Sequence, residues 1–217
     1  MTSSDADRLR AVAGRHWASQ ICSLDPLFDD LLPPGAPSLA AAIEEVLEKQ
    51  DTDQVRQLAE ALPVIEQRME RRHGEHFDEV ILGIASALAG RADLRPVFAR
   101  RFGLDGEPPG TLAESADLVG LHRERMRQIE ARLTEHLGVA QVYIPSLDRA
   151  LELLAELAPL DANEASQELV DAGSVSRSQT VEGVLRSARF MGREPGVEVD
   201  HRNRVVHIGE AGGQRDR

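Results

Sequence analysis

Apolar residues recur every three or four positions along most of this chain, which is the spacing of one face of an α-helix. In the N-terminal third, this spacing predicts helices over residues 5–23, from Ser38 to about Lys49, and from Asp51 or Thr52 toward Arg72. Consecutive prolines after Leu32 exclude helix there, and Pro63 is expected to break or kink the third helix. These helices are expected to form a small bundle.

The middle of the chain continues this spacing, interrupted by a glycine. It predicts helices over residues 77–88, 92–102 and 111–119, and, after Gly120, a helix that starts at His122. The apolar face of that last helix holds Met126, Ile129, Leu133 and Leu137. A short helix, a glycine turn and a longer helix with one polar face follow the order of a helix-turn-helix.

The C-terminal third changes from helical to strand-like spacing. Helices are predicted over Pro145–Leu157, over Asp161–Ala172, and from Ser176 or Ser178 to about Met191. Val197–Asp200 and Arg204–Ile208 then alternate as a β-hairpin, with its turn at His201–Asn203. Three helices followed by a basic-tipped hairpin follow the order of a winged helix.

These patterns together predict a mainly α-helical protein: a helical bundle with a helix-turn-helix, followed by a winged-helix module with one β-hairpin. We expect an acidic helical region over residues 1–79, a helix-turn-helix domain over 80–138 and a C-terminal module over 145–209. The Gly-rich residues 210–217 are expected to be a disordered tail.

The 217 residues carry a net charge of −12, which argues against a general nucleic-acid coat. The acidity is unevenly spread. Residues 1–90 hold 16 acidic and 8 basic side chains, residues 91–132 hold 7 and 8, and residues 133–217 hold 14 and 9. The predicted helix-turn-helix is thus the one segment that is not acidic, flanked by surfaces that keep the molecule soluble or meet a basic partner.

Location follows from what the sequence lacks. Cys22 is the single cysteine, so an internal disulfide is excluded. No apolar run reaches the roughly 20 residues of a membrane span, and the first residues lack the apolar core of a signal peptide. We therefore expect a soluble cytoplasmic protein with no membrane partner.

The predicted helix-turn-helix also carries a specific motif. It reads Arg101-Phe102-Gly103-Leu104, an acidic Gly-Pro loop to Gly110, Thr111-Leu112-Ala113-Glu114, the Gly120 turn, then Arg123 to Glu130 as RERMRQIE, and Arg132. Over about residues 80–137, the chain resembles region 4 of the bacterial sigma-70 family of transcription initiation factors. The resemblance implies a DNA-binding helix-turn-helix and, for the helix before it, a contact with RNA polymerase.

The resemblance implies which side chains read DNA. It places Arg123, Glu124 and Gln128 at the bases of the promoter −35 element, and Arg127 near base or phosphate. Arg125 and Arg132 complete the basic set of the motif, and His122 stands where the family usually has Thr or Ser, which weakens a helix cap and a phosphate contact. Arg, Gln and Glu can indeed pair with guanine, adenine and cytosine respectively. The alternative is that these residues form a solvated face with pairs within the helix.

Other site types find less support. His73 and His76 share a helical face, but two histidines alone do not fill a metal's coordination sphere. The loop Gly103–Gly110 lacks the Gly-Lys-Ser/Thr ending of a phosphate-binding loop, and no catalytic constellation stands at a readable spacing. We therefore expect no metal, no cofactor and no enzyme activity.

Two functions remain. The first is a sequence-specific transcription protein that binds double-stranded DNA and acts as a partial sigma-like regulator with bacterial RNA polymerase. A candidate second DNA contact lies in the C-terminal module, at Arg186, Arg189, Arg202 and Arg204. The alternative is that this acidic module is an accessory helical hairpin that only docks on the rest of the chain. The second function is a protein-interaction module that docks on RNA polymerase or another regulator without reading DNA. The acidic balance and His122 favour the second.

Overall fold

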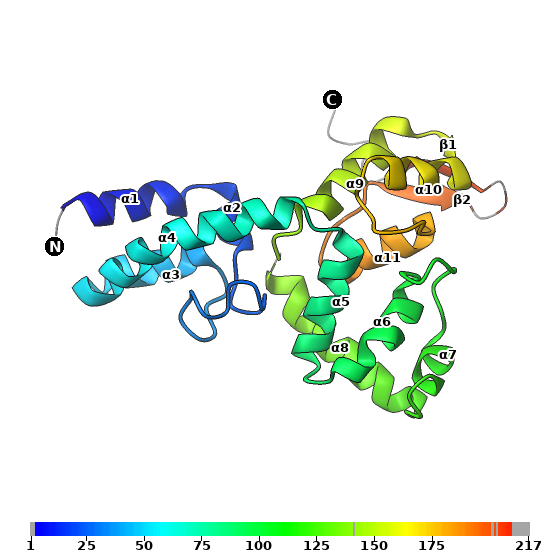
Figure 1. Ribbon diagram of the computed structural model, residues 1–217, viewed down its shortest axis with the longest axis horizontal. Helices are drawn as coiled ribbons and strands as arrows, with labels where there is room; N and C mark the ends of the chain where they lie inside the picture. The colour runs from blue at the N-terminus through cyan, green and yellow to red at the C-terminus, as the bar shows by residue number, and fades with distance from the viewer. Residues whose placement is uncertain (1–2, 141, 201, 203, 210–217) are drawn as a thin grey trace. The chain divides into compact units, whose positions relative to one another are not determined.

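A computed structural model describes residues 3–140, 142–200, 202 and 204–209 (Figure 1). The predicted C-terminal tail and two residues of the predicted hairpin turn, at positions 201 and 203, lie outside the described residues. The chain forms two compact units. The first contains residues up to Gly74 together with His136–Tyr143, and the second contains Glu75–Glu135 and the residues from Ile144 onward.

The first unit is a helical bundle. Its helices are α1 (Ser3–Ala13), α2 (His16–Gln20), α3 (Leu39–Glu48) and α4 (Thr52–His73). The predicted caps are confirmed: the Ser38 side chain accepts the Ala41 N–H, and the Asp51 side chain accepts the N–H groups of Asp53 and Gln54.

Two details of this unit differ from the sequence expectation. The single helix expected over residues 5–23 is two helices, separated at Gly14 and Arg15. α4 does not break at Pro63, because Leu62 and Ile65 on either side are fully buried. The burial of these two side chains outweighs the roughly 3 kcal/mol cost of a proline inside a helix.

One buried ion pair crosses the first unit. A terminal nitrogen of Arg72 lies 2.8 Å from each carboxylate oxygen of Asp25, and both side chains are almost fully buried. Removing either partner alone would leave a buried charge, so the pair fixes where α4 meets the loop after α2.

The second unit begins with α5 (Phe77–Leu88), the 3₁₀ turn η1 (Ala92–Leu94), α6 (Arg95–Phe102), α7 (Leu112–Asp117) and α8 (Arg123–Ala140), which runs past the unit's boundary at Glu135. The helix expected over residues 92–102 therefore starts as a 3₁₀ turn. Pro96 explains the difference, because a proline lacks an N–H and clashes with the carbonyl four residues earlier. The α-helix accordingly begins at Arg95, with the proline in its first turn.

The unit continues with α9 (Pro145–Leu157), β1 (Leu160–Asp161), α10 (Ala162–Asp171), α11 (Val181–Phe190), β2 (Val197–Asp200) and β3 (Val205–Ile208). The predicted hairpin is confirmed, since β2 pairs antiparallel with β3. β1 pairs with the other edge of β3, so the sheet order is β1-β3-β2. α11 starts later than expected, at a Thr180 cap, because Ser176 and Gln179 turn inward to bond Asp78.

The residues from α9 onward pack on α5 and α6 as one compact unit. Phe190 of α11 lies against Phe102 of α6, with ring centroids 4.3 Å apart. The Asp78 carboxylate at the start of α5 is fully buried and accepts the Ser176 N–H at 3.2 Å and the Gln179 amide at 3.3 Å. The Gln179 amide also donates to the Leu104 carbonyl at 3.2 Å. This buried network joins α5, the end of α6 and the segment before α11.

Candidate nucleic-acid interface

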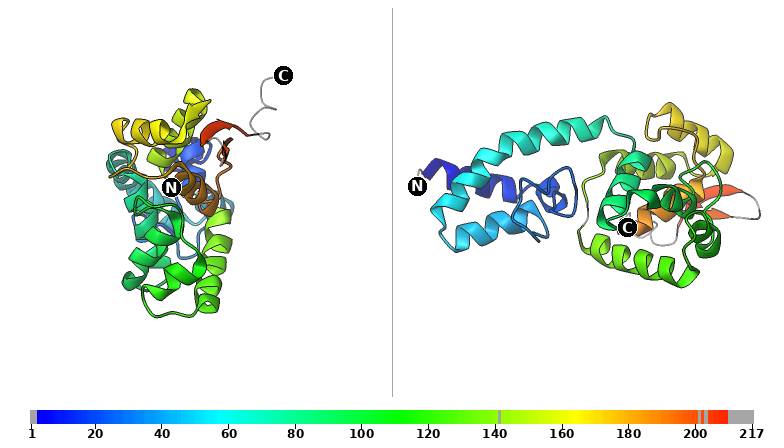
Figure 2. Two further views of the ribbon diagram at one scale, coloured as in Figure 1. Left: turned by 90° about the vertical axis from the view of Figure 1, so that its right-hand side faces the viewer. Right: turned by 60° about the horizontal axis from the view of Figure 1, so that its bottom comes forward.

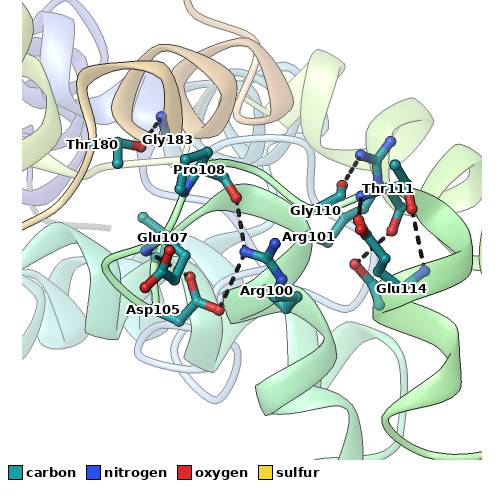
Figure 3. Close-up of polar contacts among 12 residues, drawn as sticks. Arg100, Arg101, Asp105, Glu107, Pro108, Gly110, Thr111, Glu114, Thr180 and Gly183 are labelled. Atoms are coloured by element: carbon teal, nitrogen blue, oxygen red, sulfur yellow. Dashed lines mark hydrogen bonds and ion pairs between the residues drawn. The ribbon is translucent and has the colours of Figure 1, made fainter.

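The α7–α8 pair starts from a well-capped helix. The Thr111 hydroxyl accepts the Glu114 N–H at 3.2 Å, and the Glu114 carboxylate accepts the Thr111 N–H at 2.7 Å (Figure 3). This reciprocal pair is a capping box. The Thr-x-x-Glu spacing of Thr111 and Glu114 is the sequence signal that could have predicted this capping box.

The turn between the helices uses a left-handed glycine. Gly120, at the predicted glycine turn, has φ of +65°, and the next N–H, of Leu121, donates to the Ala116 carbonyl at 3.0 Å. α8 begins at Arg123, one residue later than expected, and the His122 carbonyl accepts the N–H groups of Arg125 and Met126. The turn thereby sets the direction in which α8 leaves α7.

α8 divides into a packed face and an exposed face. Met126 and Leu137 are fully buried and Leu133 is 2% exposed, whereas Ile129 is only partly buried. The predicted DNA-reading residues are all exposed, namely His122, Arg123, Glu124, Arg125, Arg127, Gln128 and Arg132. The helical periodicity thus assigned the two faces correctly.

Two polar contacts lie on the exposed face itself. The Arg127 guanidinium makes two bonds to the Glu124 carboxylate, at 2.7 and 2.9 Å, and Arg125 donates to the Gln128 side chain at 3.4 Å. The hydrogen bond from Arg127 lowers the pKa of Glu124 below its ordinary value, and the same bond raises the pKa of Arg127. Glu124 is therefore an ionised hydrogen-bond acceptor at neutral pH, and these solvent-exposed contacts are weak enough to exchange for others.

Arg101 of α6 is largely buried, since its side chain is only 11% exposed. It donates to the Glu130 carboxylate of α8 at 2.8 Å. It also donates to the Gly110 carbonyl at 2.8 Å (Figure 3). Neighbouring Arg100 donates to the Pro108 carbonyl at 2.8 Å. The two arginines thus tie the loop over residues 105–110 and α8 to α6.

The candidate second DNA contact is divided between α11 and the hairpin. Arg186 is partly buried and lies 3.9 Å from the Glu130 carboxylate, whereas Arg189 is exposed. Arg202 and Arg204 are exposed at the hairpin turn, and Arg204 donates to Asn163 at 2.9 Å. Arg186 is therefore the member of this set that reaches α8, through the bridging carboxylate of Glu130.

The two histidines of the HGEH segment contact other parts of the chain. His73 lies 2.9 Å from the Tyr143 hydroxyl, and the His76 ring lies 3.1 Å from the Gly173 carbonyl. Among the described residues, no group of three or more His, Cys, Asp or Glu side chains is placed to hold a metal ion.

A hollow of about 630 Å³ on the second unit was not anticipated. It lies between the loop over residues 105–110, α11 and β2, and is lined by Pro108, Pro109, Glu182, Leu185, Arg186, Arg189, Glu198 and Val199. No local sequence signal could have found it, because three segments far apart in the chain form its walls.

Comparison with known proteins gives no match: no family model, no curated protein and no solved structure is similar to this chain. Within the described ranges, none of the helices is both long and apolar enough to span a bilayer. The function is therefore inferred from the geometry of α7, α8 and their surroundings.

Proposed function

We propose that the protein is a sequence-specific DNA-binding transcription protein that reads the major groove with the first two turns of α8. The observation that carries this proposal is the exposure of Arg123, Glu124, Arg127 and Gln128 on a helix whose opposite face is buried in the unit. A helix presented in this way fits the major groove of B-DNA, which is wide enough to admit it.

The side chains supply the required chemistry. Arginine donates to guanine O6 and N7, the Gln128 amide matches adenine N6 and N7, and an ionised Glu124 accepts from cytosine N4. Because the Glu124–Arg127 pair is solvent-exposed, these residues exchange their mutual contacts for base and phosphate contacts at a small cost. The resemblance to sigma-70 region 4 supports the same residues, and it suggests a partial sigma-like regulator that acts with bacterial RNA polymerase in the cytoplasm.

The α9–β3 segment supports a winged-helix assignment by its topology. Helix, strand, helix, helix and a two-stranded hairpin follow in that order, and the first strand adds to the hairpin as β1-β3-β2. In this proposal, Arg202 and Arg204 at the hairpin turn give a phosphate contact beside the duplex that α8 reads.

A second candidate function is docking on RNA polymerase or another regulator without DNA reading. The net charge of −12 favours it, as does Leu118 in the α7–α8 turn, an apolar side chain that is 56% exposed. Pull-down of polymerase by a protein that binds no duplex would favour this function over the first.

Selection from random DNA duplexes tests the proposal. The full chain is expected to enrich one motif at low salt, and Arg123→Ala or Gln128→Ala should reduce sequence preference by about 1–3 kcal/mol per lost base contact. Arg149→Gln, on the exposed side of α9, is the matched control and should leave the motif unchanged. Recovery of no enriched motif would contradict direct reading by α8.

A further inference from the structure

Glu130 lies on the border between the buried and exposed faces of α8. It follows the buried Met126 by four residues and the exposed Arg127 by three, so helical geometry places it beside both. Its side chain is 21% exposed. A contact made at this border fixes how α8 is turned about its own axis, and therefore where its exposed side chains point.

Two arginines from other helices meet at the Glu130 carboxylate. Arg101 of α6 donates to one carboxylate oxygen at 2.8 Å, and Arg186 of α11 lies 3.9 Å from the other. The first contact is a charge-assisted hydrogen bond from a largely buried guanidinium, whereas the second is a charge attraction beyond hydrogen-bond distance. Arg101 therefore holds Glu130 more strongly than Arg186 does.

Arg101 also holds the start of α7. Its guanidinium donates to the Gly110 carbonyl at 2.8 Å, and Gly110 directly precedes Thr111, which caps α7 (Figure 3). The Gly110 N–H in turn donates to the Arg100 carbonyl at 2.8 Å. One guanidinium thus links both helices of the α7–α8 pair to α6, and Glu130 is the α8 end of that link.

The orientation of α8 decides whether its side chains can form base contacts. A helix with its side chains is roughly 10–12 Å wide, so a rotation of about 10° about its axis moves side-chain atoms by about 1 Å. A hydrogen bond tolerates less than this, since N–H···O distances lie within about 2.7–3.2 Å. Without Glu130, an Arg101 nitrogen would lose its acceptor in a largely buried place, and α8 would rotate or shift to let water reach it.

We infer that Glu130 is a positioning residue for DNA reading, which holds the exposed face of α8 in its reading orientation through Arg101 and, more weakly, through Arg186. This inference rests on the proposed function and deepens it. It gives the C-terminal module a part in DNA reading without a base contact, because Arg186 of α11 acts on α8 through Glu130.

Binding of the full chain to its selected duplex and to a scrambled duplex of the same length tests this inference. Glu130→Ala should lower the ratio of the two affinities about 10-fold, and Glu130→Gln, which keeps an acceptor for Arg101, about 3-fold. Glu135→Ala removes an exposed carboxylate from the same helix and should leave the ratio unchanged. A loss of folded protein would weaken binding to both duplexes by the same factor, so the ratio isolates positioning from stability.

A double-variant cycle tests the part of Arg186. Arg186→Gln should lower the affinity ratio about 2-fold in the wild type and not at all in the Glu130→Ala variant, because it acts through Glu130. An Arg186 that contacts phosphate would instead weaken binding to both duplexes, and its loss would add to that of Glu130. That result would overturn the link to α11.

Residual dipolar couplings of the free protein provide a test that needs no DNA. They should show α8 turned relative to α6 in Glu130→Ala and unchanged in Glu135→Ala. A Glu130→Ala variant that keeps both the wild-type orientation of α8 and the wild-type affinity ratio would overturn this inference alone. A wild type that binds both duplexes equally would overturn the proposed function and, with it, the role of Glu130 in reading.

Discussion

α8 and α11 each follow another helix and a turn or loop, yet their surroundings are opposite. α8 exposes the polar side chains of its first two turns and buries one apolar stripe. α11 buries seven of its ten residues, including Gly183 and Phe190, against its neighbours. A helix-turn-helix order therefore does not by itself make a reading helix, because the free face decides what the helix can bind.

α11 is covered, unlike the polar face of α8, because of a small residue within it and buried polar residues before it. Gly183 permits the close approach to the end of α6, and the Asp78 network holds the segment that leads into α11. No comparable contact covers the exposed face of α8 among the described residues. Figure 2 shows α8, in bright green, along the outside of the second unit.

Among the substitutions that test why α11 is covered and α8 is exposed, loss of the Asp78 carboxylate is expected to have the largest effect on stability. Asp78→Ala leaves the Ser176 N–H and the Gln179 amide with fewer acceptors in a buried site, so the free energy of unfolding should fall by about 3 kcal/mol. Glu79→Ala, at the neighbouring exposed carboxylate, should cost less than about 1 kcal/mol. Urea denaturation of both variants measures the two costs, and equal costs would contradict the role of Asp78 in holding α11.

Overpacking at Gly183 is expected to have the next largest effect. Gly183→Ala forces α11 away from the Phe102 and Gly103 carbonyls, which should destabilise the protein by about 1–3 kcal/mol. Gly83→Ala is the matched control in α5, where an added Cβ meets nothing within 4 Å, and it should stabilise by up to about 1 kcal/mol. Thermal unfolding distinguishes them, and a neutral Gly183→Ala would show that α11 is free to move.

The capping box of α7 should give the smallest effect, and one that depends on pH. The Thr111 backbone N–H lowers the pKa of Glu114, so the folded state holds this carboxylate ionised to lower pH than the unfolded state does. Its stabilising contribution is therefore present above the ordinary glutamate pKa and is lost as pH falls through the lowered pKa. The stability difference between wild type and Glu114→Gln should shrink on acidification.

Asp117→Asn, in the last turn of α7, is the control for that titration. Asp117 is exposed and takes no part in the capping box, so this substitution removes one carboxylate of α7 and keeps the box intact. A Glu114→Gln variant whose stability difference from wild type stays constant across the acid range would contradict the stabilising role of the box.

Much of the fold was predictable because its signals are local. Ser38 and Asp51 are N-cap residues that predict the helices after them. Pro145–Leu157 has an uninterrupted helical spacing of apolar residues, and alternating apolar residues predict the two hairpin strands. β1 escaped prediction because two residues cannot show alternation. The later start of α11 was equally hidden, because it depends on bonds from Ser176 and Gln179 to Asp78, about a hundred residues away in sequence.

The candidate site also has features that the local sequence predicts and features that it does not. The exposed face of α8 follows from helical periodicity, since Met126 and Leu133 define the buried side. The burial of Arg101 depends on its contact with Glu130, a residue of another helix. The hollow beside β2 depends likewise on three segments, the Pro108 loop, α11 and β2, that are distant in sequence. Periodicity within one helix carries no information about contacts between segments that are distant in sequence.

Nuclear magnetic resonance of the full chain with its selected DNA duplex tests the central claim most directly. Our account predicts that the duplex shifts the amide resonances of Arg123–Gln128 and the guanidinium resonances of Arg123 and Arg127. It predicts no shift along residues 182–189 of α11. Shifts along α11 with an unchanged α8 would contradict the account.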